Sequence, residues 1–494
     1  MKTRSHLRAL AGAALIAALA IGCTVGPNYH RPDAPAAPAW KAEDPWRPGE
    51  PRDQIPKGEW WKIFGDADLD ALEAQALSGN TTLQAGIARL DQARAVARLS
   101  VAGLYPQAGA SASPSRARES GNRPFAATPG TVVTPITQST YQLSFNVAYE
   151  TDLFGRVRRT IESSNAQLQA SAADLENLRL LVESEVAADY FTVRELDAEI
   201  GVLDRTVQTL QRGLQLVEER FNGGVASGLD VAQEQTLLDS TRTQAILLRQ
   251  QRVQFEDAIG TLTGQPASNF KIAAKPMPSS LPAVPVGVPS DLLERRPDIA
   301  EAERGMASAN ALIGVARSAY YPDLSLSGGS GLQSFSLSKL ATLASGYWAV
   351  GAAIAESVLT GGARKAQVQF AEAGYNGAVA NYRGTVLGAF QEVEDDIAGL
   401  GILDQADRAQ EQAVGDARKA LGIATNRYVG GLVSYLDVVT AQQTLLANEQ
   451  LAAEIKGQRL VTSVLLVKAL GGGWDAASIA SMQVKPTVKQ ALQP

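Results

Sequence analysis

A long internal repeat constrains this chain more than any other feature. The segment from Arg220 to Val231 returns from Arg427 to Val438, 207 residues later, with its Gly-Gly, Ser and Leu-Asp positions in the same places. A Tyr-Pro pair is doubled in the same way, ending at Pro106 and at Pro322. A tandem unit of this size predicts two similar halves, in place of the roughly three domains that the length alone would suggest.

Each half contains two stretches with strand character. In the first half, apolar and polar side chains alternate over about ten residues, a length and pattern typical of a strand with one face in lipid and one in a wet lumen. The apolar positions are Tyr141, Leu143, Phe145, Val147 and Tyr149. The second half alternates less clearly around Trp348 and Val350, and Glu356 falls on the apolar side there, whereas Glu150 falls on the polar side. On pattern alone, a strand of a soluble β-sandwich remains the alternative.

A proline-free stretch follows each pair of strands, from Arg156 to Gln265 and from Arg364 to Lys485. In the first stretch, apolar residues spaced alternately by four and three form a heptad seam, which indicates a coiled coil. The seam consists of Leu196, Ile200, Leu203, Val207, Leu210, Leu214, Val217 and Phe221. One helix from Arg158 to Arg220 would measure about 95 Å at 1.5 Å per residue. No globular core needs a helix of this length, so in an exported protein we expect it to span the periplasm.

Four strands that face lipid cannot close into a barrel. An open sheet edge in hydrocarbon leaves backbone groups unpaired, at several kcal/mol each. Because the smallest membrane barrels have about eight strands, a dimer or a trimer is the least that closes. The pattern of residues does not choose between them.

The chain begins with the features of a bacterial secretory signal. Basic residues precede an apolar stretch, 9–21, that is too short to span a bilayer. The only cysteine, Cys23, follows in a sequence that resembles a lipoprotein cleavage site, and a lone thiol in an exported protein has no disulfide partner. We therefore expect Cys23 to be acylated, for example with palmitate. The expected divisions are a signal peptide (1–22), a lipidated N-terminus with a Pro-rich strap (23–59), two repeats (60–280 and 281–475) and a C-terminal tail (476–494).

The composition excludes several kinds of function. The chain has two histidines, and His6 lies in the signal segment, so His30 alone remains for a metal or catalytic cluster. We predict no catalytic residue, no metal site and no cofactor. The net charge of −6 argues against nucleic-acid binding.

Four segments resemble the outer-membrane factors of tripartite efflux systems, the TolC-like family, and its lipoprotein branch in particular. They are 23–29, 60–66, 288–299 and the paired Gly-Gly-x-x-Ser-x-Leu-Asp turns. The resemblance implies an α+β, mainly α, tandem-repeat fold: a homotrimer in which four strands per chain form a twelve-stranded barrel in the outer membrane above a periplasmic α-helical tunnel. It implies a passive exit channel for small molecules, working with a periplasmic adaptor and an inner-membrane resistance-nodulation-division pump. The alternative is a lipid-anchored coiled-coil scaffold without a channel, which has no use for the alternating strands.

The two Gly-Gly turns carry the clearest local signals. The glycines can end one helix and a Ser-x-x-Asp capping box can start the next, so each turn is predicted to be a helical hairpin. These positions are Gly223, Gly224, Ser227, Gly430, Gly431 and Ser434. The resemblance implies that the hairpin tips form the closed periplasmic end of the tunnel and contact the adaptor.

Asp437 is the candidate gate residue. The resemblance implies that acidic residues of the second repeat form rings across the channel, and Asp437 matches one such position, whereas the other is Thr440. A single ring of three carboxylates would then bind cations. The alternative is that Asp437, like Asp230 in the first repeat, only caps its helix.

Overall fold

The two halves fold into the same order of helix, two strands and two helices in the computed structural model, which describes residues 24–33, 58–121, 134–278, 295–472 and 482–485. The three matching pairs of helices are equal in length, whereas the strands are not. The matching helices are α3 (Thr81–Ala102) and α7 (Pro297–Ser318), with 22 residues each. Next come α4 (Arg156–Asn222) and α8 (Ala363–Val429), with 67 residues each. Last are α5 (Gly228–Leu262) and α9 (Tyr435–Ala469), with 35 residues each. The signal peptide, Cys23 and most of the strap lie outside the described residues.

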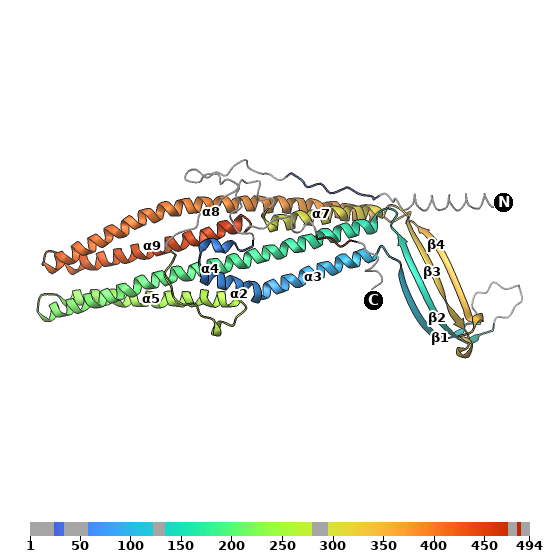
Figure 1. Ribbon diagram of the computed structural model, residues 1–494, viewed down its shortest axis with the longest axis horizontal. Helices are drawn as coiled ribbons and strands as arrows, with labels where there is room; N and C mark the ends of the chain where they lie inside the picture. The colour runs from blue at the N-terminus through green and yellow to red at the C-terminus, as the bar shows by residue number, and fades with distance from the viewer. Residues whose placement is uncertain (1–23, 34–57, 122–133, 279–294, 473–481, 486–494) are drawn as a thin grey trace.

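One antiparallel sheet forms one end of the elongated molecule (Figure 1). Its strands are β1 (Gln107–Glu119), β2 (Ile136–Thr151), β3 (Asp323–Ser334) and β4 (Gly346–Ala355), paired in that order. The register pairs Phe145 of β2 with Ser330 of β3, and Ser330 in turn with Trp348 of β4. Within the chain, β1 and β4 are therefore edge strands.

The helices next to the sheet follow the order of the strands. The chain runs from α3 into β1, from β2 into α4, from α7 into β3 and from β4 into α8. In this half of the molecule α3 packs on α4, α4 on α7 and α7 on α8. Sheet and helices thus form one continuous four-element layer, visible along the right half of Figure 1, with α3 and α8 at its two flanks.

The long helix predicted from Arg158 to Arg220 is confirmed, because α4 extends only two residues further at each end. Leu196, Leu203, Leu210 and Val217 of the heptad seam are buried, as a coiled coil requires. Phe221 is exposed, so its inclusion in the seam was wrong. At that position α4 has reached its final turn, and the hairpin tip leaves no partner beyond it.

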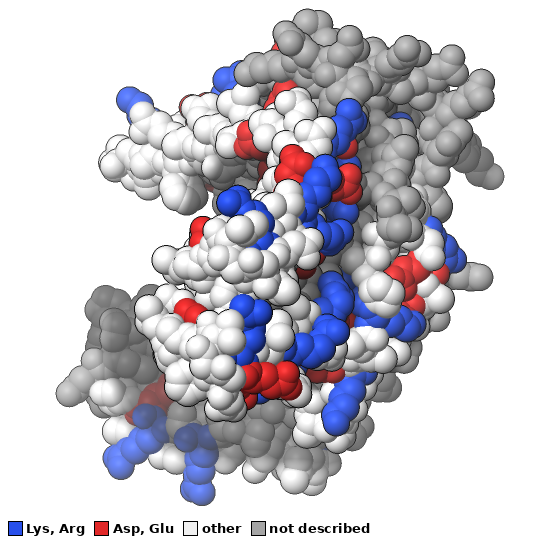
Figure 2. All heavy atoms as spheres, turned by 90° about the vertical axis from the view of Figure 1, so that its left-hand side faces the viewer, with Lys and Arg blue, Asp and Glu red and all other residues white. Residues whose placement is uncertain are grey.

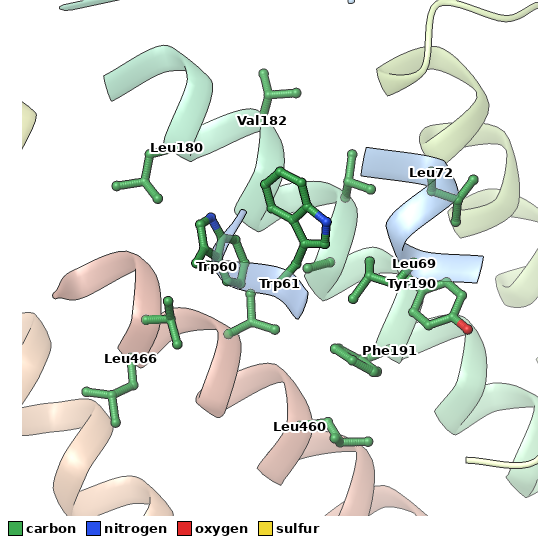
Figure 3. Packing of buried hydrophobic residues seen from close by; sticks show 14 of the residues in the cluster. Trp60, Trp61, Leu69, Leu72, Leu180, Val182, Tyr190, Phe191, Leu460 and Leu466 are labelled. Atoms are coloured by element: carbon green, nitrogen blue, oxygen red, sulfur yellow. The ribbon is translucent and has the colours of Figure 1, made fainter. Parts of the chain in front are cut away.

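The largest hydrophobic cluster lies midway along the helices (Figure 3). Short helices η1 (Trp60–Phe64) and α2 (Ala67–Gly79) pack there against α4 and α9. Trp60 and Trp61 are both buried, with their ring centroids 6.1 Å apart in an edge-to-face arrangement. The Trp-Trp pair therefore packs in the core, a region that we call the waist.

Candidate functional site

The strand register gives the sheet one apolar face and one polar face. Because cross-strand partners lie on the same face, the alternation predicted for β2 continues across all four strands. The apolar side chains of this face are Ala108, Ala110, Ala112, Tyr141, Leu143, Phe145, Val147, Tyr149, Leu324, Leu326, Leu332, Trp348, Val350 and Ile354. Gly328, Ser330 and Ser334 of β3 lie among them, so β3 is the least apolar strand on this face. The other face carries mainly serine, asparagine, glutamine, glycine and alanine. Trp348 and Val350 are exposed, so the apolar face meets no other described part of the chain there.

The strand ends explain the irregular position of Glu356. β4 ends at Ala355, so Glu356 belongs to neither face of the sheet. Its counterpart Glu150 is still within β2 and binds Arg156 at 2.5 Å, next to the start of α4. At the opposite end of the sheet, Arg116 and Arg118 follow the alanines on the apolar face of β1. Charged residues therefore delimit the apolar band at that end.

Both Gly-Gly turns connect helices at the end of the molecule remote from the sheet, as predicted (Figure 1). Gly224 and Gly431 have φ of +73° and +72°, in the left-handed region that glycine enters without steric cost. Gly223 and Gly430 remain in the right-handed helical region, with φ of −80° and −76°. Only the second glycine of each pair is therefore required by its backbone conformation.

The two predicted capping boxes differ in their hydrogen bonds. Ser227 Oγ accepts from the backbone N–H of Asp230, and the Asp230 carboxylate accepts from the Ser227 N–H at 3.1 Å. In the second repeat, the Asp437 carboxylate accepts from both the N–H of Ser434 at 3.1 Å and its hydroxyl at 2.7 Å. Asp437 is exposed and Asp230 is half-buried. Both aspartates thus hold their helix starts, while Asp437 also faces solvent in the single chain.

Equivalent apolar side chains project from the two tips. Val225 and Leu432 occupy the same place in their repeats and are 68% and 71% exposed. Leu229 and Leu436, another equivalent pair, are exposed as well. Figure 2 looks onto this end of the molecule and shows much uncharged surface among Lys, Arg, Asp and Glu side chains. Each tip therefore offers an apolar contact surface with charged neighbours.

Aromatic residues of the second hairpin tie the two hairpins together near their tips. Tyr428 of α8 and Tyr435 of α9 lie edge to face, with ring centroids 4.8 Å apart. The Arg220 guanidinium of α4 lies 5.0 Å from the centroid of the Tyr428 ring. Both tyrosines belong to a buried cluster with Leu210, Val217, Leu237, Leu238, Val438 and Val439. The hairpins of one chain thus share a core down to the last turns before the tips.

Sequence reasoning missed Glu234 of α5, which is fully buried at this junction. Burial raises its pKa, and the nearby polar side chains of Tyr435 and Gln442 of α9 partly oppose that effect. Burial and Glu234 together raise the pKa of Tyr435. No local pattern marks this site, because Glu234 is an ordinary polar residue in the sequence of α5.

Residues 24–31, the N-terminal clamp, bind where the sheet meets the helices. Val25 N donates to Phe154 O at 3.1 Å, and Arg159 donates to the backbone of Val25 and Gly26. Thr24 fills the space beside Gly155, where a Cβ would lie 2.6 Å from Thr24 Cγ2. The second repeat also holds the clamp, with Asn310 donating to Pro27 O at 3.1 Å and Tyr29 to Glu303 at 2.5 Å. The clamp therefore bridges both repeats.

The described residues offer neither a cluster of metal ligands nor a helix that could cross a membrane. No group of three or more His, Cys, Asp or Glu side chains in these segments could hold a metal ion. Likewise, none of the described helices has a stretch apolar enough to span a bilayer.

Sequence comparisons connect the chain to proteins of the outer membrane. Residues 72–265 and 288–472 match the model of a family described as outer membrane efflux protein. The outer membrane protein OprJ of Pseudomonas aeruginosa is 31% identical over 471 residues, which cover 94% of this chain and 95% of OprJ. The pyoverdine export outer membrane protein OpmQ of the same species is 33% identical over 419 residues, covering 85% of this chain and 88% of OpmQ.

Solved structures resemble the fold over nearly its whole length. The outer-membrane channel OprN superposes with a TM-score of 0.84 and 30% identity, covering 92% of this chain and all of that chain. CusC, whose structures are described in terms of folding and transmembrane channel formation, superposes with a TM-score of 0.78 at 28% identity. It covers 91% of this chain and all of that chain.

Proposed function

Because this chain belongs to the outer membrane efflux protein family, we propose that it is the exit duct of a tripartite efflux pump. Small molecules delivered by an inner-membrane resistance-nodulation-division pump and a periplasmic adaptor would pass through it without chemical change. The observation that carries the proposal is the two-faced sheet, because its strands continue directly into helices long enough to reach deep into the periplasm. No catalytic residue, metal or cofactor is assigned.

Three copies would form the duct. The chain leaves β1 and β4 as edges, and edges in lipid leave backbone groups unpaired. Pairing β4 of each copy with β1 of the next closes twelve strands, and the helices below would then enclose a tunnel. A periplasmic scaffold without a channel has no use for an apolar face that spans four strands.

The hairpin tips would be the docking site for the adaptor. The exposed pairs Val225 with Leu432 and Leu229 with Leu436 give both repeats the same apolar contact, which suits an adaptor that meets pseudo-equivalent sites around the duct. Gly223, Gly224 and Ser227, with Gly430, Gly431 and Ser434, would lie in this surface and contact the adaptor.

An acyl chain on Cys23 would anchor each copy to the outer membrane. Thr24, the residue bonded to Cys23, packs on Gly155 at the junction of sheet and helices. If the sheet spans the outer membrane, this junction lies at its periplasmic surface, where an acyl chain can enter the inner leaflet. The signal peptide would then end at residue 22, while the strap to 59, the repeats 60–280 and 281–475 and the tail to 494 are proposed from the internal repeat.

Asp437 would form the gate. It is exposed at the tip in the single chain, so a ring of three such carboxylates around an axis is open to solvent and able to bind cations.

Conductance tests the proposal directly. The purified protein should give stepwise conductance in a planar bilayer, and its mass in detergent should correspond to three mature chains. A trimer that never conducts would contradict the duct and favour the scaffold.

A further inference from the structure

The helical layer next to the sheet ends in two flanks that no described residue covers. Its order is α3, α4, α7 and α8, so α3 and α8 each have a neighbour on one side only. The edge strands of the sheet lie on the same two flanks, because α3 leads into β1 and β4 leads into α8. What covers the flanks must therefore also lie next to the edges of the sheet.

The open flank of α8 carries a second heptad seam. The seam facing α7 is apolar and buried around Tyr382, Val386 and Ala389. On the other side of α8, eight exposed residues follow the same spacing of three and four. This α8 glycine seam consists of Gln367, Phe370, Gly374, Gly377, Asn381, Gly384, Gly388 and Gln391.

The four glycines of this seam are not required by any contact with the described residues of the same chain. No described atom lies within 4 Å of a Cβ placed on Gly374, Gly377, Gly384 or Gly388. Each glycine inside a helix costs about 1 kcal/mol relative to alanine. Glycines at these positions do allow another backbone to approach closely. Phe370, in the same seam, is 84% exposed.

The open flank of α3 has a complementary composition. Leu83, Leu90 and Ala97 are buried on one side of α3. Six exposed residues with the same alternating spacing of three and four lie on the other side. This α3 alanine seam consists of Ala85, Ala88, Gln92, Ala95, Leu99 and Ala102. Leu99 is 74% exposed.

We propose that the α3 alanine seam of one copy packs on the α8 glycine seam of the next, and that this contact joins the copies below the barrel. This inference rests on the trimer proposed above and assigns its helical interface. α3 runs toward the sheet and α8 away from it, so the two helices meet antiparallel at the same level. Their lengths are similar, since the 22 residues of α3 measure about 33 Å and residues 367–391 about 38 Å. Small residues on both sides permit the closest helix spacing.

Engineered cysteines test the contact, because Cys23 is the only natural cysteine and would be acylated. Ala95→Cys is combined in turn with Gly374→Cys, Gly377→Cys and Gly384→Cys. A disulfide needs Cα atoms within about 7 Å, so at least one combination should give linked dimers and trimers on a non-reducing gel. Within a chain α4 and α7 separate α3 from α8, so such links join different copies. Ala95→Cys with Asn376→Cys, on another face of α8, is the matched control and should not link.

Packing is tested by Gly377→Leu combined with Gly384→Leu. Leucine is a better helix former than glycine, so the chain should keep its helicity while the trimer fraction falls about tenfold or more. The control is Asn376→Leu combined with Arg383→Leu, at the same level of the helix but outside the seam, and it should remain trimeric. If the wild type is a trimer but no combination links and the leucines are tolerated, this seam is wrong and the proposed duct stands. A wild type that is not a trimer overturns both.

Discussion

The indole Nε1 of Trp60 donates a 2.9 Å hydrogen bond to the buried carboxylate oxygen Oε2 of Glu183. This bond ties η1 to α4 in the waist, where Glu73 of α2 is also fully buried with no hydrogen-bond partner among the described residues. Burial raises the pKa of Glu183 to about 7, against lowering effects of Trp60 and Arg179. Burial also raises the pKa of Glu73 to about 10, with Glu183 and Asp70 adding to the shift. The waist therefore favours protonated carboxyls.

The stability of the waist should accordingly decrease as the pH rises. The usual pKa of a glutamic acid is about 4.5, and here the folded state raises it. Below pH 4.5 such an acid makes its full contribution to the free energy of unfolding, and this contribution is lost as the pH rises to the folded-state pKa. For Glu183 the loss between pH 5 and pH 8 is of the order of 3 kcal/mol at most. Thermal unfolding in detergent, followed by circular dichroism, should show it. Glu183→Gln and Glu73→Gln should flatten the profile, and an unchanged slope in both variants would contradict the assignment.

Gly223→Ala and Gly224→Ala form a matched pair at the first hairpin tip. Both sites have room for a methyl group, but only Gly224 has a positive φ. Gly224→Ala should therefore destabilise the tip by about 1 kcal/mol, and Gly223→Ala should change little. Limited proteolysis of the tip measures the difference. Equal cleavage rates would mean that the left-handed turn does not limit the stability of the tip.

Asp437→Ala and Asp230→Ala should differ, although the two aspartates occupy equivalent capping positions. Loss of the cap costs about 0.5 to 2 kcal/mol in both variants. If Asp437 also forms the gate, only Asp437→Ala should relieve block by multivalent cations added from the periplasmic side and raise the resting conductance in a planar bilayer. Cation block that persists in Asp437→Ala would return this residue to a capping role.

Acylation of Cys23 should be visible with a labelled fatty acid. The wild type should incorporate the label and Cys23→Ser should not. Each buried CH₂ of an acyl chain contributes about 0.8 kcal/mol, so several chains give a stable anchor. Because the barrel could still insert, Cys23→Ser should be found in the membrane fraction. An unlabelled wild type would exclude the anchor.

The regular parts of the fold were predictable from the sequence because they depend on periodicity. The heptads of α4 predicted that helix to within two residues at each end, and the period of two predicted the second part of β2, which begins five residues earlier than Tyr141. The repeat predicted a second pair of long helices, α8 and α9, without fixing where α9 ends. The TolC-like fold expected from the family resemblance is confirmed by the solved channels.

The contacts between distant elements could not be predicted in this way. Glu234 is an ordinary polar residue in the pattern of α5, and only the packing of α5 and α9 against α4 makes it buried. Glu73 is likewise indistinguishable from an exposed residue until α2 packs on α4. Glu356 did not fit the predicted alternation of apolar and polar residues, because the sequence pattern does not show that β4 ends at Ala355. The burial of Glu234 and Glu73 depends on other helices that pack against them, and the position of Glu356 depends on where strand pairing ends; neither leaves a local period in the sequence.

The contacts of the N-terminal clamp determine the order in which segments of this protein can reach their folded positions. Its residues leave the ribosome before the helices that they contact, because they bind Asn310 and Glu303, 283 and 274 residues further along the chain than Pro27 and Tyr29. Arg31 likewise donates to the Tyr382 hydroxyl at 3.1 Å, across 351 residues. The clamp cannot close until α7 and α8 have been exported and folded. The N-terminal clamp is therefore among the last segments to reach its place, and its closure requires that both repeats are complete.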